Sequence, residues 1–206
     1  MSYLSFSKRL ANYLSLKTGL TSEQEIIITY AIEILVLNLI NIVFTIALGA
    51  LLGVLPGTMV ALITVAAFRH TAGGAHLDSP VRCALLTIII FPLIAIIAQQ
   101  MCALSQIYID IFMVLSIIIG LLTVILLAPV DSPGAPIISS TRRRRLKVLS
   151  IIMVVLIALV VVFLRESHWV YALQIGNCLA LSVLWVSFIL SGTGKWVMSK
   201  INQIKV

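Results

Sequence analysis

The chain has 206 residues, of which 61% are hydrophobic and only 10% are charged, and its formal net charge is +7. Water-soluble domains carry about 25% charged residues, so this composition excludes a soluble globular domain and indicates an integral membrane protein. The apolar runs are long and continuous, without the alternation of a membrane barrel, which predicts membrane-spanning helices. The excess positive charge is then expected to face anionic lipid rather than nucleic acid.

The first part of the chain, residues 1–18, is expected to form an amphipathic helix at the membrane surface. Large apolar residues recur there at three- and four-residue spacing, at Tyr3, Phe6, Leu10 and Tyr13, and polar and basic residues occupy the other side. This pattern is typical of helices that lie in the membrane interface. A helix that packs on the soluble side of the bundle is the alternative interpretation.

Six apolar segments follow, and each is expected to cross the bilayer as a helix. They are residues 26–50, 56–68, 81–99, 107–127, 148–164 and 169–190. The second has only about 13 residues, roughly 20 Å of helix against a hydrocarbon core of about 30 Å. Either it begins earlier, near Gly53, or the polar segment after it is drawn into the bilayer, and the sequence leaves both open.

The first of these segments carries two further signals. The motif Ser22-x-x-Glu25 predicts a capping box ahead of the apolar run. Within the run, Glu33 is expected to face protein or a water-filled cavity, because a carboxyl group is costly to bury in lipid.

Positive charges divide unevenly between the two sides of this arrangement. With the N-terminus inside, every lysine and arginine falls on an inner segment except Arg165, which lies beside Glu166. Lysine and arginine are enriched on the cytoplasmic side of membrane proteins. The sequence therefore predicts that both termini, the polar segment of residues 69–83 and the basic loop of residues 128–147 are cytoplasmic.

The polar segment at residues 69–83 contains a histidine and a cysteine that could react together. His76 and Cys83 are seven residues apart, which on an unbroken helix would separate them by about 10 Å along the axis, too far for proton transfer. Pro80 and the pair Gly73–Gly74 instead predict a loop that folds His76 back onto Cys83, with the cysteine near the start of the next helix. A histidine beside a cysteine generates the thiolate that acts as a nucleophile.

The pattern Arg69-x4-Gly74-x-His76-x6-Cys83, with the Ala128–Pro129 turn and the basic run after it, resembles the accessory gene regulator B family. Members of this family are membrane cysteine endopeptidases that mature bacterial peptide pheromones. The resemblance implies a single peptidase domain over residues 1–206 in the bacterial cytoplasmic membrane. It implies Cys83 as the nucleophile, His76 as the base and acid, and Arg69 and Gly74 as supporting residues. Arg69 would orient the loop, favour the thiolate or hold the substrate's acidic tail.

The resemblance also implies the substrate and the reaction. The substrate is a short quorum-sensing precursor peptide with an amphipathic leader and an acidic C-terminal tail. Cleavage leaves an acyl-enzyme thioester, and a thiol or hydroxyl of the precursor then closes a cyclic thiolactone or lactone. The basic run after residue 141 has two interpretations that can hold together, a topology anchor on anionic headgroups and a clamp for the acidic tail. Its arginines are Arg142, Arg143, Arg144 and Arg145.

Other functions are less well supported by the sequence. A transporter or export channel for the peptide, with the polar segment as its gate, is the non-enzymatic alternative, but the chain has no inverted repeat. The spacing of His70, His76, Asp78 and Cys83 fits no zinc motif, so we expect no metal and no cofactor.

The two remaining cysteines and the oligomeric state complete the sequence picture. Cys102 and Cys178 lie in or near apolar segments and are expected to pack as small hydrophobic residues, which gives no disulfide framework. The sequence leaves a homodimer open.

Overall fold

The computed structural model describes residues 5–18, 21–75, 77, 79–131 and 137–203. Within these ranges the regular structure is helical and no strand forms, which confirms the predicted all-α class. The helices are α1 (Ser5–Thr18), α2 (Ser22–Leu51), α3 (Leu55–Thr71), α4 (Pro80–Met101), α5 (Gln106–Leu127), α6 (Ser140–Glu166), α7 (Ala172–Leu190) and α8 (Gly192–Gln203).

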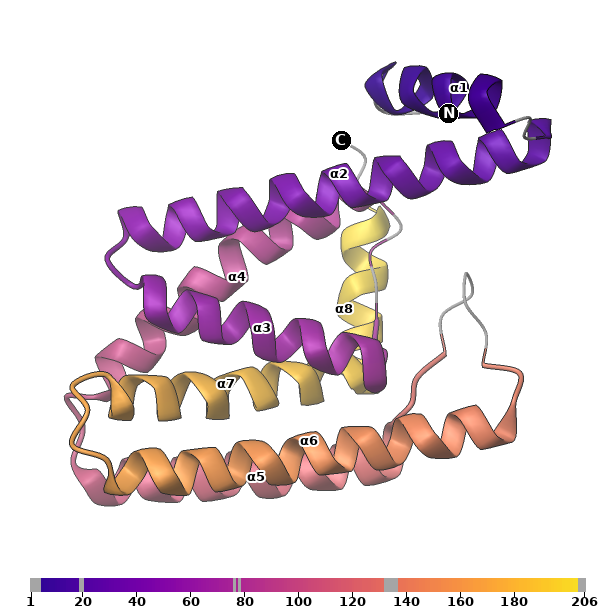
Figure 1. Cartoon of the computed structure of the whole chain (residues 1–206). Helices are drawn as coiled ribbons and strands as arrows, with labels where there is room; N and C mark the ends of the chain where they lie inside the picture. Colours follow the sequence, from indigo (N-terminus) through magenta and orange to yellow (C-terminus); the bar gives the residue numbers. More distant parts are fainter. Residues whose placement is uncertain (1–4, 19–20, 76, 78, 132–136, 204–206) are drawn as a thin grey trace.

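Helices α2 to α7 run back and forth between the two ends of a bundle (Figure 1). Short connections at residues 52–54, 102–105 and 167–171 gather at one end, which we call the turn end. The longer connections at residues 72–79 and 128–139 belong to the opposite end, which we call the loop end. Helix α8 lies across the loop end (Figure 1).

Five of these helices, α2, α4, α5, α6 and α7, are long and apolar enough to cross a membrane. Helix α3 has 17 residues and is therefore about 25 Å long, somewhat shorter than the hydrocarbon core. It extends beyond the predicted segment in both directions, from Leu55 to Thr71. Helix α3 nevertheless packs against α4 and α7 and joins the turn end to the loop end. Six helices, α2 to α7, therefore run between the two ends, as the six apolar segments predicted.

Helix α7 is the central element of the bundle. Of its apolar part 67% is buried, against 11% to 28% in the other four long helices, and α3, α4, α5 and α6 all pack against it. The contact with α5 is especially close, because a Cβ atom at Gly120 would lie 2.1 Å from Val183 Cγ1. Small residues allow membrane helices to approach in this way. The outer helices expose apolar side chains, as expected for surfaces that face lipid.

The N-terminal part of the chain forms the predicted helix. Helix α1 packs on α2 and exposes the apolar side chains of Phe6 and Tyr13, and its position in the membrane interface stays a prediction. The capping box before α2 is formed by Thr21 and Gln24, one residue earlier than predicted. The Thr21 hydroxyl accepts from the Gln24 backbone amide at 3.4 Å, and the Gln24 side-chain oxygen accepts from the Thr21 backbone amide at 3.0 Å. Glu33 is buried in protein, as expected.

The predicted loop boundaries need correction at both polar segments. Residues 69–71 are the last turn of α3 and residues 80–83 are the first turn of α4, so the connection is only residues 72–79. The basic run is not part of a loop, because α6 begins at Ser140 and its first turns contain all four arginines. The Ser139 hydroxyl caps this helix by accepting from the Arg142 amide at 3.4 Å, and arginine, leucine and lysine favour helix once it has begun.

Candidate functional site

Cys83 lies in the first turn of α4, at the loop end. The helix begins at Pro80 after the extended residue Ser79, and the Cys83 amide donates to the Ser79 carbonyl at 3.1 Å. Proline is favoured at this position because its missing amide hydrogen has no partner in the first turn. The first turn also stabilises negative charge through the aligned peptide dipoles. The sulfur, which is half-buried, therefore lies where an anion is stabilised.

Arg69 joins the last turn of α3 to this cysteine. Its Nη2 atom donates to Cys83 Sγ at 3.5 Å, across the connection of residues 72–79. A cation is favoured at the C-terminal turn of a helix, so the end of α3 stabilises the charge of Arg69. Of the site residues predicted from the sequence, Arg69 and Cys83 are in direct contact.

Two glycines set the path of the connection. Gly73 has φ +73° and Gly74 has φ +128°, the positive values that the glycine pair predicted. A Cβ atom at Gly73 would lie 2.2 Å from the Val130 carbonyl oxygen, so a larger residue has no room there.

The connection is held from two sides. The Val130 amide donates to the Ala72 carbonyl at 2.9 Å, which attaches the connection to the segment after α5. The Ala75 amide donates to the Ile189 carbonyl at 2.9 Å, which attaches it to the end of α7. Residues far apart in the sequence thus hold the backbone next to Cys83.

A cavity of about 20 Å³ lies beside the Cys83 thiol, large enough for about one water molecule. Its wall is mostly apolar and includes Ala75 and Leu77 of the connection, Trp185 of α7 and Met198 of α8. These α7 and α8 residues were not predicted from the sequence, since they lie about a hundred residues beyond Cys83 and carry no local motif.

The structure describes only some of the other polar residues at positions 69–83. His76 and Asp78 lie outside the described residues, so the predicted contact between His76 and Cys83 stays a prediction. Their chain neighbours Ala75 and Leu77 both line the cavity with Cys83. His70 is exposed on the last turn of α3 and does not line the cavity. In the part of the chain that the structure describes, no group of histidine, cysteine and acidic residues could hold a metal ion.

The four arginines at the start of α6 have exposed side chains at the loop end. Arg143 forms an ion pair with Asp131, which the sequence analysis did not single out. Asp131 follows Val130, whose amide is bonded to the connection of residues 72–79. The basic helix is therefore attached to the site by a short series of polar contacts.

The other two cysteines lie away from this site. Cys102 is at the turn end, where the Asn177 side-chain amide contacts its sulfur at 3.7 Å. Burial raises the pKa of the Cys102 thiol, and the contact with Asn177 offsets part of this effect. Cys178 is buried in α7 and its thiol donates to the Gly57 carbonyl at 3.0 Å. Cys178 packs in the core, as the sequence predicted, whereas Cys102 is only half-buried, and all three cysteines are free thiols.

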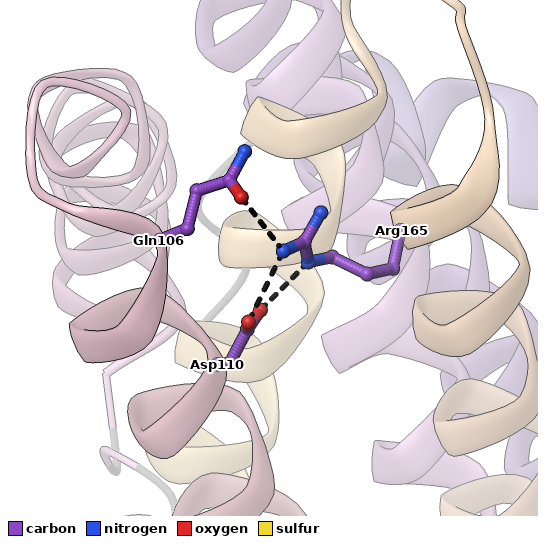
Figure 2. A network of polar contacts seen from close by, with 3 residues as sticks. All are labelled: Gln106, Asp110 and Arg165. Atoms are coloured by element: carbon purple, nitrogen blue, oxygen red, sulfur yellow. Dashed lines mark hydrogen bonds and ion pairs between the residues drawn. The ribbon is translucent and has the colours of Figure 1, made fainter.

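The turn end also holds a closed polar network between α5 and α6. Arg165 donates from Nε to Asp110 Oδ1 at 2.7 Å and from Nη2 to Asp110 Oδ2 at 3.1 Å. The same Nη2 donates to Gln106 Oε1 at 3.2 Å (Figure 2). This two-pronged pair fixes the ends of the two helices and is a structural feature.

Comparison with known proteins gives a consistent family match. A model of the accessory gene regulator B family matches residues 7–190. An AgrB-like protein of Clostridium perfringens strain 13 is 26% identical over 204 residues, which cover 96% of this chain and 95% of the relative. The accessory gene regulator protein B of Staphylococcus aureus strain bovine RF122 is 28% identical over 161 residues, 78% of this chain and 82% of the relative. No solved structure matches the chain significantly.

Proposed function

Since the chain belongs to the accessory gene regulator B family, we propose that it is a membrane-embedded cysteine endopeptidase that matures a small peptide pheromone. The family acts in the accessory gene regulator quorum-sensing system, and the chain is a multi-pass membrane protein. The finer proposal is that it removes the C-terminal tail of a precursor peptide and yields a cyclic thiolactone or lactone.

The observation that carries this proposal is the contact of Arg69 with the thiol of Cys83. The Arg69 guanidinium lies 3.5 Å from the sulfur, where it can bind a negatively charged group that reaches this cysteine, and a cysteine sulfur is a strong nucleophile. The sulfur is half-buried beside a mostly apolar cavity, where bulk water has little access to a thioester. The sulfur atoms of Cys102 and Cys178 instead contact backbone carbonyls and the side-chain amide of Asn177.

We propose His76 as the base because Ala75 and Leu77, its neighbours in the chain, line the cavity that contains Cys83. His76 takes the proton of the Cys83 thiol, and the sulfur forms a bond to a peptide carbonyl carbon of the precursor. The carbon–nitrogen bond then breaks, His76 returns the proton to the leaving amine, and the C-terminal fragment departs.

The acyl-enzyme thioester then transfers its acyl group within the precursor. A thiol or hydroxyl of the precursor attacks the thioester carbonyl, the carbon–sulfur bond to Cys83 breaks, and the proton of the attacking group returns to the Cys83 sulfur. The product is a thiolactone or a lactone, and the enzyme is free again. No bond to water is made, so exclusion of water decides the ratio of cyclic to hydrolysed product.

The exposed arginines of α6 support binding of an acidic tail at the same end. Arg142, Arg144 and Arg145 form no ion pair among the described residues, whereas Arg143 is paired with Asp131. The series of contacts from Arg143 through Asp131 and Val130 to Ala72 places this helix next to the reactive connection. We propose that the loop end is cytoplasmic, because the precursor is made in the cytoplasm and the lysines and arginines gather on this side.

The proposal is tested by cleavage of a precursor with cysteine variants. Cys83→Ala should abolish both cleavage and cyclisation, because both steps use the same sulfur, and His76→Ala should abolish cleavage. Cys102→Ala is the matched control, since it removes a thiol at the turn end, and should process the precursor normally. A Cys83→Ala protein that still cleaves the precursor excludes the peptidase mechanism, and transport of uncleaved peptide by that variant would support the export channel instead.

A further inference from the structure

Helix α8 (Gly192–Gln203) has one buried face against the loop end of the bundle. Gly194 and Met198 are buried and Ile201 is partly buried. These positions are separated by four and three residues, so they lie on the same side of the helix. The start of the helix packs tightly on the end of α7, because a Cβ atom at Gly194 would lie 2.0 Å from the Phe188 carbonyl oxygen.

The buried face of α8 reaches the site in two ways. Met198 lines the cavity beside Cys83 and packs with Leu77 of the connection. Arg82, the residue before Cys83, donates from Nη1 to the carbonyl of Asn202 at 2.9 Å and to that of Ile201 at 3.3 Å. A cation bonded to the last carbonyls of a helix is a stabilising cap. Helix α8 is therefore attached both to the cavity and to the turn that carries the cysteine.

The remaining surface of α8 is exposed and positively charged. Trp196 has 64% of its surface exposed, and Lys200 Nζ lies 6.0 Å from the centre of its ring. Lys195 is exposed beside them, and the helix contains no acidic residue. Tryptophan and lysine are the residues that anchor protein at the boundary between bilayer and water. Because α8 runs across the direction of the membrane-crossing helices (Figure 1), we expect its long axis to lie in the plane of that boundary.

We propose that the exposed face of α8, formed by Lys195, Trp196 and Lys200, binds anionic lipid headgroups, and that this binding holds Met198 over the cavity beside Cys83. The purely positive face is complementary to anionic lipid, and the exposed tryptophan ring fits the headgroup layer. Met198 and Arg82 are then positioning residues, which act on the site through the packing of α8. The inference rests on the proposed function only because that proposal makes Cys83 the nucleophile.

The test measures how fast a bulky maleimide labels Cys83 in the full-length protein, by mass spectrometry of the labelled peptide. The protein is placed in nanodiscs of phosphatidylcholine, with or without about one third phosphatidylglycerol, and no peptide is added. Labelling should be slower in the anionic discs, because docked α8 covers the cavity. Each lysine near an anionic surface changes the docking equilibrium by about five-fold, so the effect of two lysines is on the order of 25-fold at most.

Variants separate α8 from general surface charge. The double variant Lys195→Gln/Lys200→Gln should label at the same rate in both lipids. The matched control Arg9→Gln/Lys17→Gln removes two exposed charges from α1, and should keep the wild-type lipid dependence. Met198→Ala should label faster in both lipids, and Met198→Leu should restore slow labelling in anionic discs.

Equal labelling of the wild-type protein in the two lipids would overturn the inference. So would a double α8 variant that keeps its lipid dependence, or an α1 control that loses it. Because labelling needs no precursor, the result is independent of catalysis. Lipid-dependent labelling in a protein that cleaves no precursor would refute the proposed function alone, and normal cleavage with lipid-independent labelling would refute only this inference.

Discussion

The two ends of the bundle hold their arginines in different ways. At the turn end, Arg165 donates to both carboxylate oxygens of Asp110 and to Gln106 (Figure 2), so its charge is neutralised between two helices. At the loop end, the four arginines of α6 are exposed, and among them only Arg143 forms an ion pair with a described residue. A neutralised charge fastens helices together, whereas an arginine that faces solvent is available to a ligand. This difference supports our proposal that the loop end is the reactive end.

The largest expected effect comes from a glycine at the loop end. Gly73→Ala should abolish precursor cleavage, because its Cβ atom would lie 2.2 Å from the Val130 carbonyl oxygen and would displace the connection beside Cys83. A residue with a side chain at this positive φ costs a further 1–2 kcal/mol, approximately. Cleavage rate and thermal stability of the purified protein are the measurements.

Gly53 at the turn end provides the matched control. Its φ is +71°, nearly that of Gly73, but a Cβ atom there would meet nothing within 4 Å. Gly53→Ala should therefore lower the free energy of unfolding only by the cost of a side chain at positive φ, about 1–2 kcal/mol, and should cleave the precursor at the wild-type rate. If the two variants were equally active, the connection next to Cys83 would not need its close packing, and the contrast between the two ends would fail at this point.

The second prediction concerns the side of the membrane on which each end of the bundle lies. A cysteine introduced at Ser140, in the first turn of α6, should be shielded from an impermeant maleimide in intact cells, and one at Ser167 at the turn end should be labelled. The reason is the concentration of lysine and arginine at the loop end. Labelling of position 140 from outside would reverse the proposed orientation and place the site outside the cytoplasm.

A smaller effect is expected from the exposed arginines. The triple variant Arg142→Gln/Arg144→Gln/Arg145→Gln keeps the ion pair of Arg143 and should raise the KM for a precursor with an acidic tail by at least about three-fold, since exposed ion pairs are individually weak. Added salt should raise the wild-type KM in the same direction and should affect the variant less, because salt screens exposed charges.

Arg165→Gln controls for the loss of an arginine elsewhere. It should lower thermal stability, because Asp110 loses its hydrogen-bond donors, and should leave the KM unchanged. A triple variant that inserts in the correct orientation and keeps the wild-type KM would leave these arginines only the role of a topology anchor.

The helices could be predicted because continuous apolar runs have one favourable solution in a membrane. The polar ends of these helices could not be predicted, because a hydropathy pattern gives no information about where a helix ends once it has left the apolar region. The basic turns of α6 depend on the cap by Ser139, and α8 depends on a glycine contact with α7 and on Arg82. The capping box before α2 was shifted by one residue because Thr21 and Ser22 are both good caps and the sequence alone does not choose between them.

The site could be predicted only as far as its local pattern extends. The sequence paired Arg69 with the reactive segment, and the structure brings its guanidinium to Cys83. The conformation of the two glycines was also predictable, since glycine is the residue that adopts positive φ. The part of the cavity wall formed by Trp185 and Met198 was not predictable, because it depends on how α7 and α8 pack against α4. The spacing of residues within a segment does not contain that information.

The central claim, that Cys83 is the nucleophile of this reaction, is tested most directly by trapping the acyl-enzyme. The wild-type protein is mixed with a precursor whose internal nucleophile is changed to alanine, so that the thioester forms but cyclisation cannot follow. Mass spectrometry should find the N-terminal part of the precursor attached to Cys83 alone, and hydroxylamine should release it, as it does thioesters. An adduct on Cys102 or Cys178, or cleavage with no hydroxylamine-sensitive adduct, would contradict the assignment of Cys83.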